Sequence, residues 1–217
     1  KFLYKDNEFI KINNALEVQK FIFNKNIRNK IREKYGIKEN EILIGHIGRF
    51  IEVKNHKFIL EIFEKLKRKN KNYKLMLIGD GELQDRIKQD VLKLNMEKDV
   101  IFTGVINDIS NYYSAFDIFI LPSLREGLPI VSLEAQVNGI KCIISKNVDE
   151  NCRVIEKNVK MLPLDLEEWV NEIQKININY DRQIKYKKFK EKELDIDEEV
   201  KKLDKIYLDN IKKGIRT

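Results

Sequence analysis

The sequence of 217 residues has few groups that bind metals or form disulfides, because it contains only two cysteines and two histidines. Cys142 and Cys152 follow neither a metal-binding nor a redox spacing, and the apolar run around Cys142 indicates a buried structural thiol. His46 falls in an apolar stretch and His56 in a helix-like one, with no third histidine and no clustered ligands. We therefore predict no metal site and a reducing, cytoplasmic setting.

Several ligand-binding signatures are also missing. No G-x-x-x-x-G-K-[ST] phosphate loop occurs. GDGELQ at 79–84 stands where a dinucleotide-binding glycine motif would, but Gln84 replaces its third glycine, and Asp99 precedes the next apolar run instead of ending it. The lone D-x-D, at 195–197, lies in a charged tail, far from every predicted strand end. These absences disfavour a dinucleotide cofactor and a metal–diphosphate clamp.

Long hydrophobic runs are absent too, since none approaches the ~18–20 residues of a membrane span. Charge is plentiful: 42 basic and 35 acidic residues give a net charge of +7. Residues 182–217 hold 12 basic and 8 acidic side chains, interspersed with apolar residues at helical spacing. We interpret this tail as solvated helix, with weak peripheral contact to an anionic membrane surface as the second interpretation. No basic and aromatic motif for nucleic acid appears, so nucleic acid is not a predicted partner.

The middle of the chain alternates between apolar runs and amphipathic stretches. We expect strands at 41–48, 73–79, 99–104, 117–123, 140–145 and 159–164, and helices at 23–37, 54–70, 81–95, 108–116, 128–139 and from 166 onward, after a short strand and turn at 9–18. Nearly all-apolar strands alternating with helices predict an α/β fold, a doubly wound parallel sheet of the Rossmann-like kind. We divide the chain into an entry segment at 1–40, the Rossmann-like domain at 41–180 and C-terminal helices at 181–217.

Loops that follow the predicted strands carry glycines and charged residues. In a parallel sheet such loops meet at the carboxyl edge, where ligands bind. Three of the first four loops begin with glycine, which lets a backbone approach a ligand closely. Arg49 follows the first strand and Lys54 begins the next predicted helix, where a cation is disfavoured unless an anion lies nearby. The loops therefore predict an anion site.

The stretch PSLREGLPIVSLEAQVNG, residues 122–139, holds two glutamates eight positions apart, Glu126 and Glu134. Pro129 suits the first position of a helix, and Asn138 with Gly139 suits its end. Helical steps of 100° place Glu134 on the apolar face, where a carboxylate needs hydrogen-bond donors. The free N–H groups at the helix start favour an anion. We predict a polar ligand that bears phosphate.

The runs GHIGRFIEVKNH, LMLIGDGEL and VIFTGVINDISNYYSAFDIFILPSLREGLPIVSLEAQVNG resemble the donor-binding half of retaining GT-B glycosyltransferases of the family 4, or group 1, type. The likeness covers about residues 10–180, and the E-x7-E pattern of Glu126 and Glu134 is its most specific part. It implies one half of a GT-B fold and transfer of a hexose-type sugar from a nucleoside diphosphate sugar. UDP is the commonest nucleotide in the donors of such enzymes. It implies no cofactor and no metal.

The resemblance also implies residue roles. Arg49 and Lys54 would bind the diphosphate and stabilise the charge that grows as the glycosidic bond breaks, and Glu126 would hold hydroxyls of the transferred sugar. Glu134 would accept the ribose hydroxyls. The remaining donor-binding positions are Gly48, Gly79, Val105, Gly127 and Leu128.

A complete enzyme of this family has two Rossmann-like domains, and its acceptor binds mostly in the N-terminal one. We find only the donor half here, so we expect weak nucleotide-sugar binding and little transfer to a polysaccharide or glycolipid acceptor without that partner domain. The cysteine usage and the charged tail together predict a cytoplasmic position, with the inner face of the membrane as the second interpretation. A non-catalytic nucleotide-binding or scaffolding module of GT-B origin is the alternative, and retention of Arg49, Lys54, Glu126 and Glu134 favours the enzyme. A GT-B epimerase or a flavodoxin-like signalling domain fits these residues less well.

Overall fold

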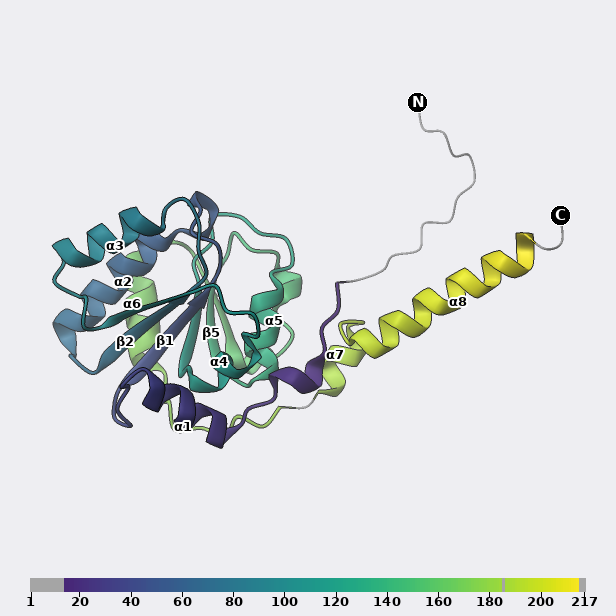
Figure 1. Cartoon of the computed structure of the whole chain (residues 1–217), viewed down its shortest axis with the longest axis horizontal. Helices are drawn as coiled ribbons and strands as arrows, with labels where there is room; N and C mark the ends of the chain where they lie inside the picture. Colours follow the sequence, from purple (N-terminus) through teal and green to yellow (C-terminus); the bar gives the residue numbers. More distant parts are fainter. Residues whose placement is uncertain (1–13, 185, 215–217) are drawn as a thin grey trace, which may run out of the picture. The chain divides into compact units, whose positions relative to one another are not determined.

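The computed structural model describes residues 14–184 and 186–214, which form two compact units (Figure 1). The larger unit falls within residues 19–185, and the smaller one is formed by described residues on either side of it. The strand expected at 9–18 lies partly outside the described residues. At its end the chain forms a 3₁₀ turn, η1 (Val18–Phe21), instead.

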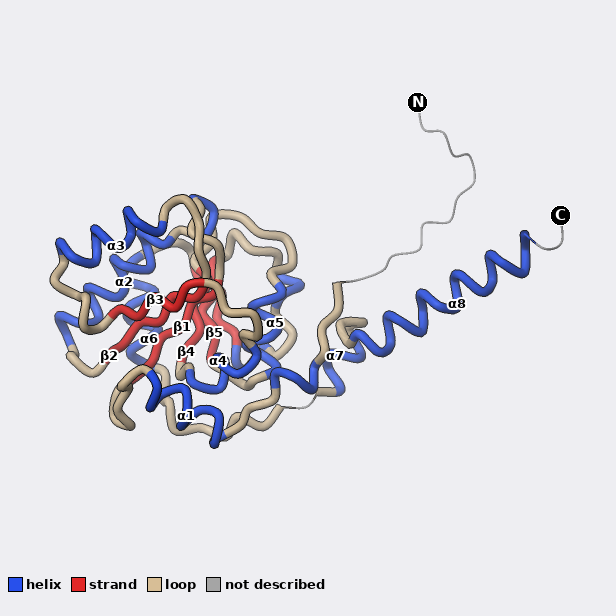
Figure 2. Tube along the Cα trace, in the orientation of Figure 1, coloured by secondary structure: helices blue, strands red, loops and turns tan. Residues whose placement is uncertain are grey.

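A six-stranded parallel sheet forms the centre of the larger unit, in the order β3-β2-β1-β4-β5-β6 (Figure 2). Its strands are β1 (Ile42–Ile47), β2 (Tyr73–Ile78), β3 (Val100–Gly104), β4 (Ile118–Leu121), β5 (Lys141–Ser145) and β6 (Val159–Leu162). All six predicted strands are present, each shorter than its apolar run. The central register aligns Ile44 of β1 with Leu75 on one side and Ile118 on the other. The prediction of a doubly wound, Rossmann-like sheet is confirmed.

Helices cover both faces of the sheet (Figures 1 and 2). Those of the larger unit are α1 (Lys25–Lys34), α2 (His56–Lys69), α3 (Gln84–Lys93), α4 (Ser110–Ala115), α5 (Ile130–Val137) and α6 (Leu166–Lys175), with 3₁₀ turns η2 (Glu52–Lys54), η3 (Glu150–Cys152) and η4 (Glu156–Asn158). Helices α2, α3 and α6 bury their apolar sides in one core cluster against the sheet. On the opposite face, α4 contacts both α1 and α5.

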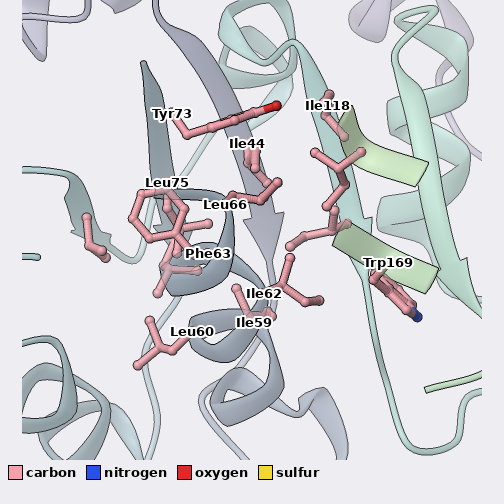
Figure 3. Close-up of a cluster of buried hydrophobic side chains, with 14 of the residues drawn as sticks. Ile44, Ile59, Leu60, Ile62, Phe63, Leu66, Tyr73, Leu75, Ile118 and Trp169 are labelled. Atoms are coloured by element: carbon pink, nitrogen blue, oxygen red, sulfur yellow. The ribbon is translucent and has the colours of Figure 1, made fainter. Parts of the chain in front are cut away.

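The core cluster explains why the apolar spacing of the second predicted helix matters. Figure 3 shows side chains of α2 packed between the strands and Trp169 of α6. Ile59, Ile62 and Leu66 recur at helical spacing and are fully buried. Burying a side chain of this size contributes roughly 1.5–3 kcal/mol. Because the strands are apolar on both faces, the same sheet supports the helices on its other side.

Helix α1 is anchored to the amino edge of the sheet by buried charge. The carboxylate of Asp117, just before β4, accepts hydrogen bonds from Arg28 at 2.5 Å, from Arg32 at 3.0 Å and from the N–H of Leu43 at 2.7 Å. Two cations and a backbone donor compensate the desolvation of this carboxylate. Helix α1 thus packs in the same unit as the sheet, although we placed it in the entry segment. The division of the chain at residues 40 and 180 stays a prediction.

The smaller unit combines residues that precede the larger unit with residues that follow it. A parallel bridge between Leu16 and Asp195 pairs these two segments. It contains α7 (Lys187–Glu191) and α8 (Ile196–Gly214), so the helical spacing of the tail is confirmed. Phe189 and Leu194 are buried, whereas the apolar side chains along α8 are largely exposed. Among the described residues, no helix combines the length and apolar character that crossing a membrane requires.

Candidate functional site

The strand order defines where a ligand can enter. From β1 the chain runs outward through β2 to β3, and α4 then returns it to β4, which pairs with the other side of β1. The chain therefore leaves the neighbouring strands β1 and β4 in opposite directions at the carboxyl edge of the sheet. In doubly wound sheets this switch point is where ligands bind. The loops concerned are 48–55 and 122–129.

An ion pair joins these two loops. The ammonium group of Lys54 donates to Glu126 Oε2 at 2.7 Å, and the two side chains are only 17% and 15% exposed. The hydroxyl of Ser123 donates to Glu126 Oε1, so both carboxylate oxygens have a partner. The structure thus brings together two of the predicted catalytic residues. Sequence reasoning missed Ser123, whose position three residues before Glu126 was the available signal.

The backbone of the Glu126 loop is fixed on both sides. The N–H of Leu124 donates to the carbonyl of Val53 at 2.8 Å, and the side-chain amide of Asn55 donates to the carbonyl of Pro122 at 3.2 Å. The N–H of Asp149 donates to the carbonyl of Glu126 at 3.1 Å. Glu126 is therefore held between η2 and the segment that follows β5, and its side-chain direction is set by structure on both sides.

Arg49 differs from Lys54. It is exposed, and among the described residues its guanidinium has neither an ion pair nor a hydrogen bond. Lys54 was expected at the start of a helix, but it ends η2, and α2 begins only at His56 after Asn55 turns into the left-handed region with φ 56°. The Lys54 stem lies over Gly48, whose added Cβ would come within 3.2 Å of Lys54 Cδ. The Lys54 stem thus packs against the residue before Arg49, and of these two cations only Lys54 has a partner among the described residues.

The glycines of the neighbouring loop have a structural reason that the sequence did not reveal. Gly79 has φ 135°, and a Cβ there would overlap the carbonyl oxygen of Gly48. Gly81 has φ 146° and faces the backbone of Phe50 in the same way. The backbone that Gly79 approaches closely belongs to the protein itself, and the contact of Gly79 with a donor stays a prediction.

Other predicted donor-binding positions are open. An added Cβ at Gly127 would meet nothing within 4 Å, and Val105 is 63% exposed. Within the described part of the chain, the N–H groups of Gly127 and Leu128 have no acceptor. Both precede α5, so these donors add to the positive end of that helix. This is the arrangement that an anionic or hydroxyl-bearing ligand requires.

Glu134 lies in the second turn of α5 and is 8% exposed, which confirms its predicted place on the apolar face. Its Oε2 accepts a hydrogen bond of 2.5 Å from the hydroxyl of Tyr113 in α4. Burial raises the pKa of Glu134, and the Tyr113 hydrogen bond opposes that rise. Pro129 was expected as the first helical residue, but its ψ of 108° makes it the N-cap. The predicted end at Asn138 and Gly139 is confirmed.

Tyr113 could not be identified from the sequence. A buried carboxylate indicates that some donor is needed, but Tyr113 lies 21 residues away in another helix. Among the described residues, Glu134 makes no hydrogen bond or ion pair with Lys54 or Glu126, and its hydrogen-bond partner is Tyr113.

Two buried imidazoles adjoin the loop after β1. His46 Nδ1 hydrogen-bonds to the carbonyl of Ile120 at 2.9 Å, and its ring meets that of His56 edge-on at 4.9 Å. Burial, with the nearby charge of Lys54, lowers the pKa of His56 to about 4, and burial also lowers that of His46. In the described residues, no group of three or more His, Cys, Asp or Glu side chains could hold a metal ion.

Comparison with known proteins adds an independent finding. The family model for glycosyl transferases group 1 matches residues 27–194. EpsF of Bacillus subtilis (strain 168), a provisionally assigned glycosyltransferase, is 38% identical over 63% of this chain and 36% of its own length. An Escherichia coli UDP-Gal:alpha-D-GlcNAc-diphosphoundecaprenol alpha-1,3-galactosyltransferase is 31% identical over 97% of this chain and 57% of its own length. The chain thus spans about half or less of these relatives.

The fold has a close structural counterpart. The crystal structure of Anabaena Alr3699/HepE in complex with UDP and glucose matches with a TM-score of 0.76 and 19% identity, over 90% of this chain and 55% of that chain. At this identity the match establishes the shared fold.

Proposed function

The chain belongs to the glycosyl transferases group 1 family, and on that premise we propose that it supplies the donor-binding half of a retaining enzyme. This enzyme moves a hexose-type sugar from a nucleoside diphosphate sugar to a polysaccharide or glycolipid acceptor. The sheet is one Rossmann-like half of the GT-B fold. The UDP-bound state of the Anabaena protein supports a UDP-sugar as donor. The name of the E. coli relative, which specifies a diphosphoundecaprenol-linked acceptor, supports a glycolipid.

One observation carries the proposal: the Lys54–Glu126 pair closes the switch point between β1 and β4. The carboxylate anchors the ammonium group at 2.7 Å, so that charge is already oriented before a ligand arrives. Charge that is oriented in advance is what stabilises developing negative charge in a transition state. As the glycosidic bond breaks, that charge grows on the diphosphate leaving group.

Each of the remaining groups would contact a different part of the donor. Arg49, exposed and without a partner in the described chain, would fork two phosphate oxygens. The free N–H groups of Gly127 and Leu128 would contact sugar and phosphate oxygens. Glu126 would accept hydroxyls of the transferred sugar, and Glu134 would accept those of the ribose. Gly48, Gly79 and Val105 would line the pocket. The chemistry so assigned uses no metal and no cofactor.

The proposal extends to the setting of the enzyme. A polyprenyl-linked acceptor is held in a membrane, so we place the chain at the cytoplasmic face of the membrane, with its nucleotide-sugar in solution. We also assign acceptor binding to a partner domain, which supplies the second wall of the donor site.

Calorimetric titration with UDP, GDP, ADP and UDP-glucose tests the proposal. We expect one nucleotide series to bind, and Lys54→Met to weaken its binding about tenfold or more, because a charge-assisted contact to phosphate is lost. Lys57→Met is the matched control, since Lys57 is an exposed lysine on the next turn of the same segment. Equal affinity of wild type and Lys54→Met for the nucleotide would contradict the proposed role of the Lys54–Glu126 pair.

A further inference from the structure

Tyr113 is held rigidly by the hydrophobic interior. It is fully buried in α4, and its ring contacts those of Phe21, Phe116 and Phe119 at centroid distances of 5.7, 6.1 and 6.1 Å. A ring packed on several sides has a single direction in which its hydroxyl can point. That hydroxyl meets Glu134 Oε2 at 2.5 Å, with the carbonyl of Val131 farther away at 3.3 Å.

Glu134 is under-compensated for a buried carboxylate. An ionised carboxylate offers about four acceptor positions, and Tyr113 occupies one of them. Among the described residues, no arginine or lysine forms an ion pair with Glu134, and no second donor reaches it. Asp117 in the same unit shows the contrast, since two arginines and a backbone N–H compensate it. Glu134 therefore retains acceptor capacity that the protein does not use.

A tyrosine orients such a carboxylate without neutralising it. Burial, together with the charge of Glu134, raises the pKa of Tyr113 well above its ordinary value, so the hydroxyl remains a donor throughout the physiological range. An arginine in its place would occupy both oxygens in a fork. A single O–H fixes one oxygen and leaves the other free.

We infer that Tyr113 is a positioning residue for Glu134: it holds Oε2 so that Oε1 and the second lone pair of Oε2 accept the two hydroxyls of a vicinal diol. The ligand class is a ribonucleoside diphosphate, read through its 2′- and 3′-hydroxyls. The inference rests on the proposed function, and it adds a residue from a different helix to the donor site.

Two probes differ only in the diol: UDP and 2′,3′-dideoxy-UDP. We expect wild type to bind UDP more tightly by about tenfold or more, because each hydroxyl would donate to a charged acceptor. In Tyr113→Phe, which keeps the ring and its packing, the affinity for UDP falls to within about threefold of that for the dideoxy probe. The affinity for the dideoxy probe itself stays unchanged. A general loss of structure would weaken both probes equally.

Tyr112→Phe is the matched control. Tyr112 precedes Tyr113 in α4 and is also buried, but its hydroxyl lies 3.2 Å from that of Tyr35, away from Glu134. We expect this variant to keep the preference of the wild type for UDP. In a Glu134→Gln background, Tyr113→Phe should change the preference no further, because a positioning residue acts only through its partner. Additive effects of the two substitutions would overturn the inference.

A ligand-free measurement separates this inference from the proposed function. Carbon-13 NMR titration should show a higher pKa for Glu134 in Tyr113→Phe than in wild type, since the hydrogen bond to the charged form is lost. An unchanged pKa would overturn the positioning role. If wild type binds UDP and the dideoxy probe with equal affinity, Glu134 does not recognise the 2′- and 3′-hydroxyls. That result would overturn the inference but not the proposed nucleotide site. Absence of binding to both would overturn the proposed function and the recognition of the diol, whatever the NMR result.

Discussion

Buried ionisable residues of the larger unit are compensated to different degrees. Asp117 has three donors, Glu126 has two and Glu134 has one. His46 Nε2 and both ring nitrogens of His56 have no partner in the described chain. Because the charged form of a buried imidazole is costly, the folded protein keeps both rings neutral.

The two histidines make stability dependent on pH. The pKa of His56 is about 4 in the folded chain against 6.5 for the free side chain. Between these values the unfolded chain binds a proton that the native chain does not, so stability is complete above pH 6.5 and falls as the pH falls. The slope is about 1.4 kcal/mol per pH unit for each histidine. In urea denaturation between pH 7.5 and 5, the free energy of unfolding of His56→Leu should fall less steeply with falling pH than that of wild type. Below pH 6.5 the difference in slope should be about the contribution of one histidine.

Glu134 acts with the opposite sign, since its raised pKa makes the native chain bind the extra proton. Comparing His56→Leu with wild type cancels this contribution, because both proteins contain Glu134. Identical pH slopes for the two proteins would contradict the interpretation of His56 as a buried neutral base.

The sequence predicted the strands and helices that hold the candidate site more completely than the side-chain contacts between them. Apolar strands covered on both faces leave a clear signal in the sequence, and each predicted strand is present. The Lys54–Glu126 pair spans 72 residues, and it forms because β4 pairs with β1 instead of β3. Strand order depends on tertiary packing, which local periodicity does not contain. The same holds for Tyr113, while the burial of Glu134 could be predicted from helical periodicity alone.

The loop glycines give a prediction at the level of these elements. Gly79→Ala should destabilise the chain by about 2 kcal/mol or more, because a Cβ would overlap the carbonyl of Gly48 at a φ that side chains rarely adopt. Gly127→Ala should change the free energy of unfolding by less than about 0.5 kcal/mol, since an added Cβ there meets nothing within 4 Å. Urea denaturation measures both. Equal destabilisation would contradict the assignment of Gly79 to loop packing.

At the level of the whole molecule, the loops that hold Lys54 and Glu126, for which we propose donor binding, lie at one edge of the sheet. The chain spans about half or less of the relatives it matches. Val105 and Leu124 are exposed apolar side chains in loops of this edge. Under the proposed function, such an edge would contact a nucleotide from one side only, and catalysis would need a second wall that excludes water and positions the acceptor.

We therefore expect the chain to bind its nucleotide-sugar without transferring the sugar at an appreciable rate. Incubation with the donor that calorimetry identifies, followed by chromatography of the released nucleoside diphosphate, measures this directly. Addition of an N-terminal domain from a group 1 relative should raise the rate, with Lys54→Met as the inactive control. Rapid transfer by the chain alone would contradict the expectation, and binding without transfer under every condition would favour a non-catalytic module.

Asp117 and its two arginines close the amino edge of the sheet, opposite the open loops. The ion pairs that hold the fold and the loops for which we propose ligand binding are thereby separated by the length of the strands. Selection for a different sugar or base can act on the carboxyl-edge loops while the ion pairs at the other edge preserve the ability to fold. A lineage built on this plan can diversify its substrates without first acquiring compensating core mutations.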